Sequence, residues 1–564
     1  MTSEPLFPKF VFMNRRDVIS LSIPATATTG QDFSNPARTT SGLIPYSGPW
    51  TQAEVKHLLR RAMFGAPKAD VDFFVSAGKA TTISSILTVP TTAPNPPLWP
   101  YNANYQDPAV AQGETWVNAQ QDNQATGYRK RSLQAWWTGL MLNQSRNILE
   151  KMTLFWSNHF STEIDIVNFP AYSYRTVALC REMALGNFKT LTKKITLDPG
   201  MLRYLNGALN TASAPDENYG RELQELFTVG KDANGNPYYN QSDVVAASKV
   251  LTGYRINNAS LSSYFDPTRH DTTNKTFSSY YNNTVITGRT GTAGANELDD
   301  LLDMIFLKNE VAINICRNLY RFFVYYDIDA STEANVIEPL ATIFRNNQYE
   351  IAPVLAALFG SEHFFDPLNR SCIIKAPMDF AVGFSRDFGI LFPDSGNLVG
   401  QYNLWFKLES QIEVMNQKLG NPPNVAGWPA YYQEPQFHEL WINSVTLPNR
   451  NLFTDLMVAN GYVSSGIRIK ADLVAYTATL TNPEDPVLLI QEVVDLHYPA
   501  DVSQTVKDYL KGILLSGQST NDYWTTAWTD YTGAPTNASY VAIVKTRLQA
   551  MYKYLMNLSE YQLS

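Results

Sequence analysis

Apolar side chains recur every three to four residues along most of this chain, and two such runs flank a polar turn near its middle. In the segment 216–230, Tyr219, Leu223 and Phe227 share one helical face. Gly230 follows as a residue that can end the helix in a left-handed conformation. The pattern predicts an amphipathic helix, whose polar face is either solvated or turned into a cleft.

The polar face of this helix carries paired charges. Glu217, Arg221 and Glu225 are spaced four residues apart, so Arg221 is expected to bridge both carboxylates. Glu222 lies on the same side. If the face lines a cleft, Arg221 would hold one carboxylate in place while another acts as an acid, a base or a ligand.

A second helix is predicted from Asn240 onward. Asn240 can cap it, and Asp243 stands three residues later, as in a capping box. The turn before it also has the spacing of a calcium loop, at positions 1, 3, 5, 9 and 12 of a twelve-residue window. The candidate ligands are Asp232, Asn234, Asn236, Asn240 and Asp243. Pro237 stands where such a loop needs glycine, and turns of this composition also occur without metal.

Helical spacing dominates the rest of the chain. One helix is expected after Thr51, with Val55 and Leu58 on its apolar face. Its other face is basic and carries Lys56, His57, Arg60 and Arg61. Further helices are predicted at 125–160, 172–189, 190–205, 295–307, 309–326, 332–346, 350–359, 375–391, 404–419, 450–460, 485–496, 502–515 and 537–557. Alternation at 284–287 suggests a hairpin, so we expect a mainly α protein: a large multi-helix body with long irregular loops and one small β-hairpin.

Composition and charge exclude some classes of protein. The 564 residues carry a net charge of −8, and the 44 Lys and Arg residues are spread out, so no basic nucleic-acid footprint is present. No apolar run reaches the length of a membrane span. Cys180, Cys316 and Cys372 lie far apart in apolar contexts and are expected to be buried free thiols.

The N-terminal segment has the form of a twin-arginine export signal. Arg15 and Arg16 precede a short apolar stretch, and Ala25-Thr26-Ala27 resembles a cleavage site. Export to the periplasm or the extracellular space is therefore expected, and the alternative is a cytoplasmic tail. We divide the chain into a signal-like segment and linker at 1–48, a main helical domain at 49–450 and a C-terminal helical region at 451–564, packed on the main domain.

Six segments together resemble a large bacterial family of unknown function, DUF1800, over nearly the whole chain. They are HLLRRAMFG (57–65), LFWSNHFST (154–162), DENYGRELQELFTVG (216–230), NQSDVVAASKVLTGY (240–254), HDTTNK (270–275) and NPPNVAGWP (421–429). The resemblance implies a helical protein that is often exported and whose gene commonly neighbours that of a sulfatase-like protein, a possible partner. Asn240 stands where the family often has Thr, and the 231–239 turn is longer than in many members.

Histidines and carboxylates in these segments form the candidate catalytic set. It comprises His159, Glu217, Arg221, Glu222, His270, Asp271 and Lys275. Two histidines with carboxylates would suit zinc, manganese or iron, and without metal the same groups suit acid–base chemistry. A lone histidine more often bonds a backbone carbonyl in a purely structural role. The sequence leaves the cofactor unknown, with a divalent metal as one candidate.

Aromatic residues near 428 form a candidate substrate-binding wall. Trp428, Tyr431 and Tyr432 can stack on a sugar ring, although the prolines and Gly427 around them also fit a rigid structural turn. Two functions follow. The first is an exported hydrolase, metal-assisted or acid–base, acting on an envelope or extracellular polymer. The second is a non-enzymatic scaffold or accessory protein of a cell-surface or secretion system.

Overall fold

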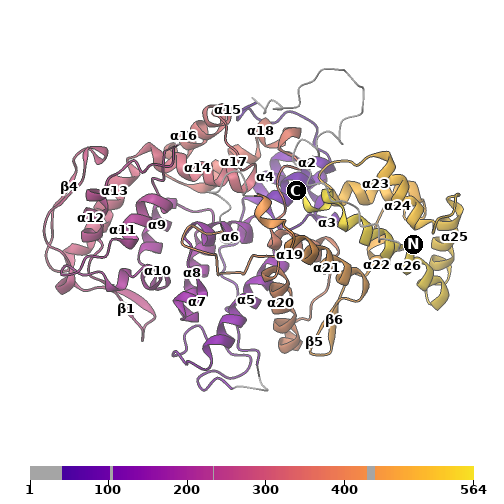
Figure 1. Ribbon diagram of the computed structural model, residues 1–564, viewed down its shortest axis with the longest axis horizontal. Helices are drawn as coiled ribbons and strands as arrows, with labels where there is room; N and C mark the ends of the chain where they lie inside the picture. Colours follow the sequence, from indigo (N-terminus) through magenta and orange to yellow (C-terminus); the bar gives the residue numbers. More distant parts are fainter. Residues whose placement is uncertain (1–40, 102–105, 233, 429–437) are drawn as a thin grey trace, which may run out of the picture.

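The protein is a long array of helices with three small antiparallel hairpins in the part of the chain that the structure describes. This structure is a computed structural model, and it describes residues 41–101, 106–232, 234–428 and 438–564. Figure 1 shows α24, α25 and α26 at one end of the molecule and α12, α13 and β4 at the other, with α2, α6 and α19 between them. The mainly α class predicted from periodicity is confirmed.

The first part of the chain supplies the helices at the centre and at one end of the molecule. They are α2 (Gln52–Ala62), α3 (Lys68–Ala77), α4 (Lys79–Ile86), α5 (Thr126–Leu142), α6 (Leu149–His159), α7 (Ile164–Val167), α8 (Pro170–Glu182), α9 (Phe188–Thr196), α10 (Pro199–Tyr204), α11 (Asn218–Glu222) and α12 (Gln241–Val250). Two capping predictions are confirmed. Thr51 with Glu54 and Asn240 with Asp243 each form a capping box.

The middle of the chain forms six further α-helices and the last part forms eight, within the described residues. The middle supplies α13 (Glu297–Phe306), α14 (Asn309–Phe323), α15 (Ala330–Thr332), α16 (Glu338–Asn346), α17 (Ile351–Phe359) and α18 (Glu362–Phe365). The last part forms α19 (Pro377–Asp387), α20 (Leu398–Glu413), α21 (Thr446–Ala459), α22 (Leu473–Thr477), α23 (Pro486–His497), α24 (Gln504–Leu514), α25 (Asp522–Gly533) and α26 (Ala538–Asn557). Helix α25 was not predicted, because many of its residues are Thr or Asp and its apolar periodicity is weak. Only Trp524 and Trp528 are buried on its inner side.

The hairpins lie in segments that periodicity assigned to loops. Strand β3 (Lys275–Thr276) pairs with β4 (Val285–Ile286), where one hairpin was expected. Strands β1 (Tyr254–Asn257) and β2 (Ser262–Phe265) form a second, and β5 (Tyr462–Ser464) and β6 (Ile467–Ile469) a third. The expectation of one hairpin is thus too low, because these strands are too short to show an alternating pattern.

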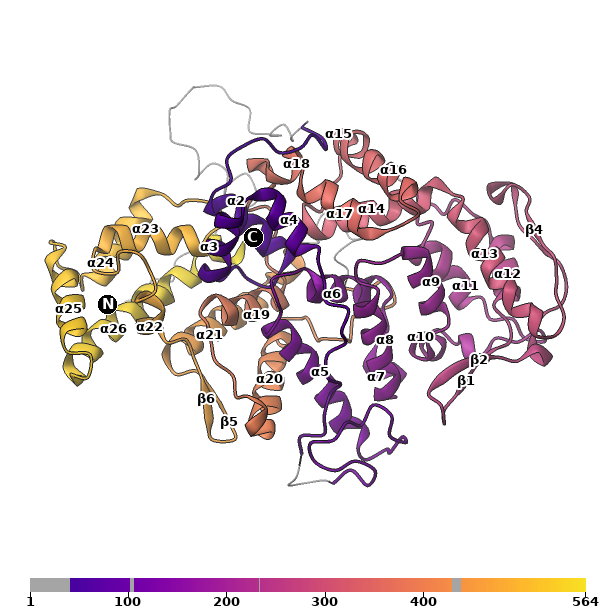
Figure 2. The same ribbon diagram turned by 180° about the vertical axis from the view of Figure 1, so that it is seen from behind.

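Two hydrophobic clusters form most of the core. The first gathers buried residues between Tyr46 and Cys372, and the second gathers residues between Phe64 and Tyr561. Helix α20 packs against α5, and α21 packs against α26, so the second cluster joins early and late parts of the chain. The boundary that was expected after position 450 lies inside α21, and other residues of this helix belong to the second cluster. Figure 2 shows the same arrangement from behind, with α19, α20 and α21 beside α5.

The basic side of α2 is buried, which corrects the sequence expectation of a basic face. Lys56, His57, Arg60 and Arg61 are each at most 7% exposed, because α23, the 364–372 segment and the end of the chain cover them. The three cysteines are free and buried, as expected. None of the described helices combines the length and the hydrophobicity needed to cross a membrane.

Candidate functional site

His159 ends α6 inside an aromatic shell. Its Nε2 lies 3.1 Å from the carbonyl oxygen of Phe227, and its ring packs on Phe155, Phe160 and Phe188. Burial lowers the pKa of His159 to about 4, so the imidazole is neutral at pH 7 and donates Nε2–H to that carbonyl. This is the structural role that sequence reasoning set beside the catalytic one.

His270 and Lys275 form a buried ionic group with Glu297. The Nε2 atom of His270 lies 3.2 Å from Glu297 Oε1, and Lys275 Nζ lies 2.6 Å from Glu297 Oε2. All three side chains are at most 1% exposed. Asp271 lies at the edge of the group, and its Oδ1 accepts hydrogen bonds from Thr273. Sequence reasoning missed Glu297, because nothing in the spacing links the start of α13 to the 270–275 loop.

Arg221 pairs with one of its two expected partners. Its Nη2 lies 3.1 Å from Glu217 Oε2 and also donates to Gln241 Oε1. Glu225 instead pairs with Lys231 at 2.6 Å, so the expected double bridge is wrong. Helix α11 continues as a π-helical turn, η2 (Leu223–Phe227), which carries Glu225. Lys231, just beyond this turn, competes for the carboxylate that Arg221 was expected to hold.

Glu222 stands at the junction of α11 and η2. It is half-buried, and its carboxylate forms no hydrogen bond or ion pair within the described ranges. Burial, and then the negative charge of Glu225, raise the pKa of Glu222 to about 7, against the opposing effects of Arg221 and Lys231. Glu222 is therefore the one member of the predicted set that is both near solvent and close to titrating at neutral pH.

Tyrosines and a further carboxylate surround Glu222. The hydroxyl of Tyr204, at the end of α10, donates to Glu163 Oε1 at 2.7 Å, and Glu163 and Glu222 both raise the pKa of Tyr204, after burial. Tyr239 donates to Glu225 Oε2 at 3.3 Å, and its pKa is raised by burial and then by Glu225. Sequence reasoning missed these residues as site members. The one available signal is that Glu163 directly follows the segment 154–162.

Three of the five candidate calcium ligands, Asp232, Asn240 and Asp243, use their side-chain oxygens within the protein. Asp232 Oδ1 accepts from the backbone N–H groups of Asn234 and Asn236, and Asn240 Oδ1 caps α12. Buried Asp243 accepts from the backbone N–H groups of Asn240 and Ser278, and from the hydroxyl of Ser278. Among the residues that the structure describes, no group of three or more His, Cys, Asp or Glu side chains is arranged to hold a metal ion.

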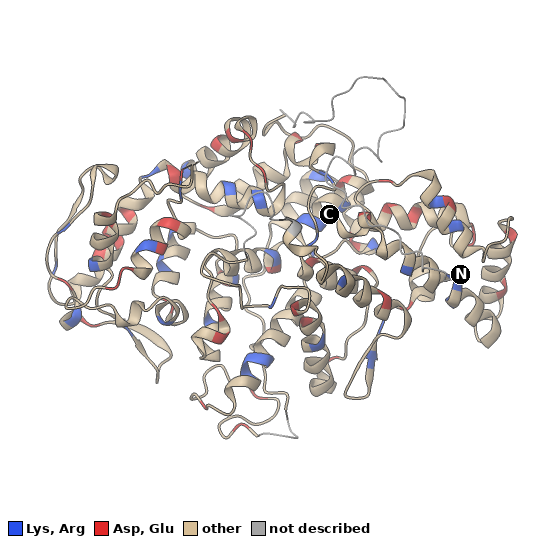
Figure 3. Ribbon diagram, in the orientation of Figure 1, with Lys and Arg blue, Asp and Glu red and all other residues tan. Residues whose placement is uncertain are grey.

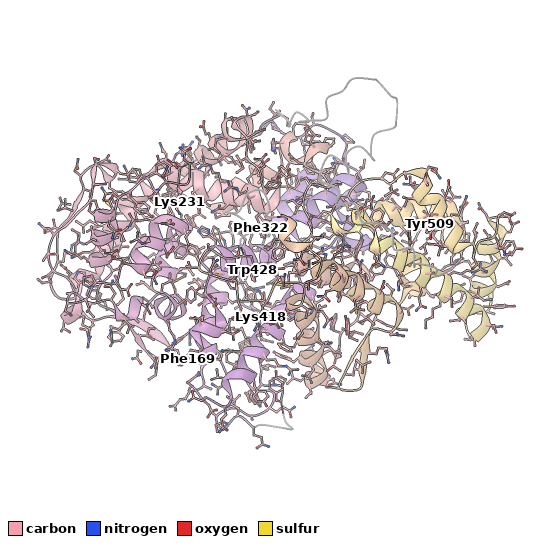
Figure 4. All side chains as sticks on the ribbon, viewed as in Figure 1. Phe169, Lys231, Phe322, Lys418, Trp428 and Tyr509 are labelled. Atoms are coloured by element: carbon pink, nitrogen blue, oxygen red, sulfur yellow. The ribbon has the colours of Figure 1, made fainter. Side chains whose placement is uncertain are left out.

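Trp428 is buried at the centre of the molecule, where Figure 4 labels it. Its backbone N–H donates to Asn158 Oδ1, so the 421–428 segment is fixed against the end of α6. With 6% exposure, its ring packs in the second core cluster instead of facing solvent. Tyr431 and Tyr432 lie outside the described residues.

The contacts of the seven catalytic candidates fall into three groups. His159 contacts the end of η2; Glu217, Arg221 and Glu222 lie along α11; and His270, Asp271 and Lys275 gather around Glu297. Figure 3 shows charges of both signs spread over the ribbon. The group near solvent, the carboxylates of Glu163, Glu222 and Glu225 with Tyr204 and Tyr239, is called the α11 carboxylate site below.

This helical chain belongs to the family described as protein of unknown function (DUF1800). The model of this family matches residues 57–563, which confirms the resemblance over nearly the whole length. The match includes the second half of α2, the α11 carboxylate site and the buried His270 group. Comparisons with curated proteins and with solved structures gave no match.

Proposed function

We propose that the protein is an acid–base hydrolase whose proton-transferring group is Glu222 in the α11 carboxylate site. The observation that carries the proposal is that Glu222 is half-buried at the start of a π-helical turn and has no partner within the described chain. π turns are rare and often occur at functional sites. A carboxyl group with a pKa of about 7 can give and take a proton at neutral pH.

The neighbouring carboxylates complete a two-acid arrangement. Glu225 is held by Lys231 and supplies a second carboxyl group, while protonated Glu222 supplies an acid. In a hydrolytic step, Glu222 protonates the leaving oxygen as its bond to carbon breaks. Glu225 takes a proton from the water whose oxygen bonds to that carbon. Tyr204, oriented by Glu163, is placed to hydrogen-bond the substrate.

The proposed substrate is an ester- or glycoside-linked polymer of the cell envelope or the extracellular space. Because Glu222 keeps contact with solvent, a long chain can reach it without entering a closed pocket. The proposed location rests on the twin-arginine pattern at Arg15 and Arg16, which lies outside the described residues. A sulfatase-like protein remains the proposed partner on the resemblance alone.

A non-enzymatic scaffold is the second candidate. It is favoured by the burial of His159 and of the His270–Glu297–Lys275 group, since both fix loops to helices instead of facing a substrate. In that case Glu222 would be a partly desolvated surface residue with no chemical role.

The proposal is tested on wild-type protein and the variant Glu222→Gln, with Glu182→Gln as matched control. Glu182 forms an exposed ion pair with Lys194 away from the site. A panel of nitrophenyl esters, nitrophenyl glycosides and envelope polymers is screened. The expected result is hydrolysis whose rate falls above about pH 7, with kcat at least ~100-fold lower in Glu222→Gln alone. Hydrolysis that is equal in all three proteins would contradict the role of Glu222.

A second readout does not depend on the substrate. A water-soluble carbodiimide modifies protonated carboxyl groups, so Glu222 is expected to be labelled at pH 6.5 and protected at pH 8.5, as peptide mapping by mass spectrometry would show (both values are about half to one and a half units from its pKa). If Glu222 is labelled only near the ordinary pKa of a glutamate, about 4.3, and the panel shows no hydrolysis, the scaffold is favoured.

A further inference from the structure

Four cationic side chains meet in the interior where α2 crosses the last part of the chain. Arg60 Nη2 donates to the carbonyl of Leu496 at 2.5 Å, and Arg61 Nη2 donates to the carbonyls of Asn369 and Ser564. Lys375 Nζ donates to the carbonyl of Tyr561 at 2.7 Å and lies 4.1 Å from the centre of its ring. Arg450 donates from Nη2 to the backbone carbonyl of Lys375.

Several N–H groups of these arginines have no acceptor within the described chain. They are Nε and Nη1 of Arg60, Nε and Nη1 of Arg61, and Nη1 of Arg450. Arg60 is 6% exposed, Arg61 2% and Arg450 0%. A buried charged donor without an acceptor is strongly unfavourable, so such groups in a folded protein indicate an acceptor that the chain itself does not provide.

The local carboxylates do not balance these charges. Asp379 is already paired with Lys151. Asp387 accepts from the backbone N–H of Ala66 at 2.6 Å and is the acidic group that acts on both Arg60 and Lys375. Asp379 also acts on Lys375 and Arg450, so two carboxylates, Asp379 and Asp387, face the basic groups of Arg60, Arg61, Lys375, Arg450 and Lys151. Basic groups therefore outnumber carboxylates in this part of the interior.

A small cavity opens at this point. Arg60, Lys375, Asp387, Phe384 and Tyr561 are among the residues that line it, and it has room for about one water-sized body or a slightly larger one. We propose that this cavity is a binding site for a single halide-sized monovalent anion, held by the free N–H groups of Arg60 and by the Nζ group of Lys375. A water molecule would satisfy a donor there, but it would not offset the charge.

Chloride and bromide are the probes for the test. Melting temperatures are measured for the full chain in sodium chloride, bromide, sulfate and gluconate at one ionic strength, so that general screening is constant. Chloride and bromide are expected to raise the melting temperature in a saturable way, because they bind only the folded state, whereas sulfate and gluconate are too large for the cavity. In crystals soaked in bromide, an anomalous peak is expected beside Arg60.

The variant Arg60→Met removes the free donors and keeps an unbranched side chain that reaches about as far as Nε. It is expected to raise the chloride concentration for half-maximal stabilisation roughly tenfold or more, while Arg468→Met, an exposed arginine on β6, leaves it unchanged. If Arg60→Met does not fold, Lys375→Met and the bromide peak in the wild-type protein decide the question. Equal melting temperatures in all four salts, or a bromide-soaked crystal without a peak in this cavity, would overturn the proposal.

Discussion

The side-chain oxygen Oδ1 of Asn158 accepts a hydrogen bond of 2.9 Å from the backbone N–H of Trp428, a residue 270 positions away. The bond brings the end of α6 and the 421–428 segment into direct contact. Gly427, which directly precedes Trp428, has a φ of +85°. A Cβ atom on Gly427 would lie 2.4 Å from Oδ1 of Asn158 and 2.7 Å from the backbone carbonyl oxygen of Asn158. Two segments that the sequence analysis treated separately thus form one structural unit.

Replacing Gly427 by alanine is therefore expected to destabilise the protein. The added Cβ would collide with the backbone of Asn158, and an L-residue is strained at that φ, so the expected cost is at least about 2 kcal/mol. Urea denaturation followed by circular dichroism measures it. Gly512→Ala in α24 is the control, since open space surrounds its Cβ position and alanine favours a helix. Equal stability of the two variants would contradict the close approach.

The buried group around Glu297 provides a second prediction. In Glu297→Gln, Lys275 and His270 lose their carboxylate partner while they remain buried, so a loss of roughly 3 to 5 kcal/mol is expected. Glu182→Gln removes only an exposed ion pair with Lys194 and is expected to cost less than about 1 kcal/mol. The free energies of unfolding from urea titrations at pH 7 distinguish the two. A small effect for Glu297→Gln would mean that water reaches Lys275.

Local signals predicted much of the fold but little of the site. Thr51 and Asn240 were correctly placed at helix starts, because caps depend on neighbouring residues. Gly230 has the expected left-handed backbone, but the helical segment before it already ends at Phe227. The π turn at 223–227 was not predicted, since its residues have ordinary α-helical periodicity. The partner of His270 and Lys275 is Glu297, and that pairing depends on how distant segments pack, which no spacing in the sequence encodes.

The burial of the α2 cations also could not be predicted from local sequence. Lys56, Arg60 and Arg61 follow the pattern of a solvated face, and only the later helices that cover them turn that face into interior. Similarly, the site residues Glu163, Tyr204 and Glu222 come from three segments whose meeting follows from tertiary packing. The sequence identified Glu222 as a candidate, but it did not supply the neighbours that distinguish it from Glu217.

His159 should make stability depend on acid. Its pKa falls from 6.5 to about 4 on folding, because the buried imidazole stays neutral. Above pH 6.5 neither state is protonated and its contribution to stability is complete. Between pH 6.5 and 4 the unfolded state gains a proton that the folded state does not, and stability falls by roughly 3 kcal/mol. His159→Gln, which keeps a donor for Phe227, is expected to flatten this part of the curve.

Urea denaturation from pH 4 to 8 tests this. His57 and His497 are also buried and have lowered pKa values, so the wild-type protein and His159→Gln will both lose stability in acid. The prediction concerns the difference between the two curves, which should be constant above pH 6.5 and should shift in favour of His159→Gln as the pH falls. Parallel curves over the whole range would show that His159 titrates normally in the folded protein.

The 232–243 turn should be insensitive to calcium. Since Asp232, Asn240 and Asp243 already accept hydrogen bonds from the backbone, neither calcium nor a chelator is expected to change the melting temperature. Asn240→Ala removes the cap of α12 and should cost about 1 kcal/mol with or without calcium. Differential scanning calorimetry in both conditions checks this. A calcium-dependent rise that Asn240→Ala abolishes would restore the calcium-loop interpretation.

The contacts of α2 also determine the order in which the protein can be completed. Lys56 and Arg60 bind carbonyls of residues 436 to 442 positions further along the chain, and Arg61 binds carbonyls 308 and 503 positions further. During synthesis on the ribosome, α2 is made long before the native acceptors of Lys56 and Arg60. A nascent chain must therefore keep this side of α2 solvated until those residues have been made, and this part of the interior closes late.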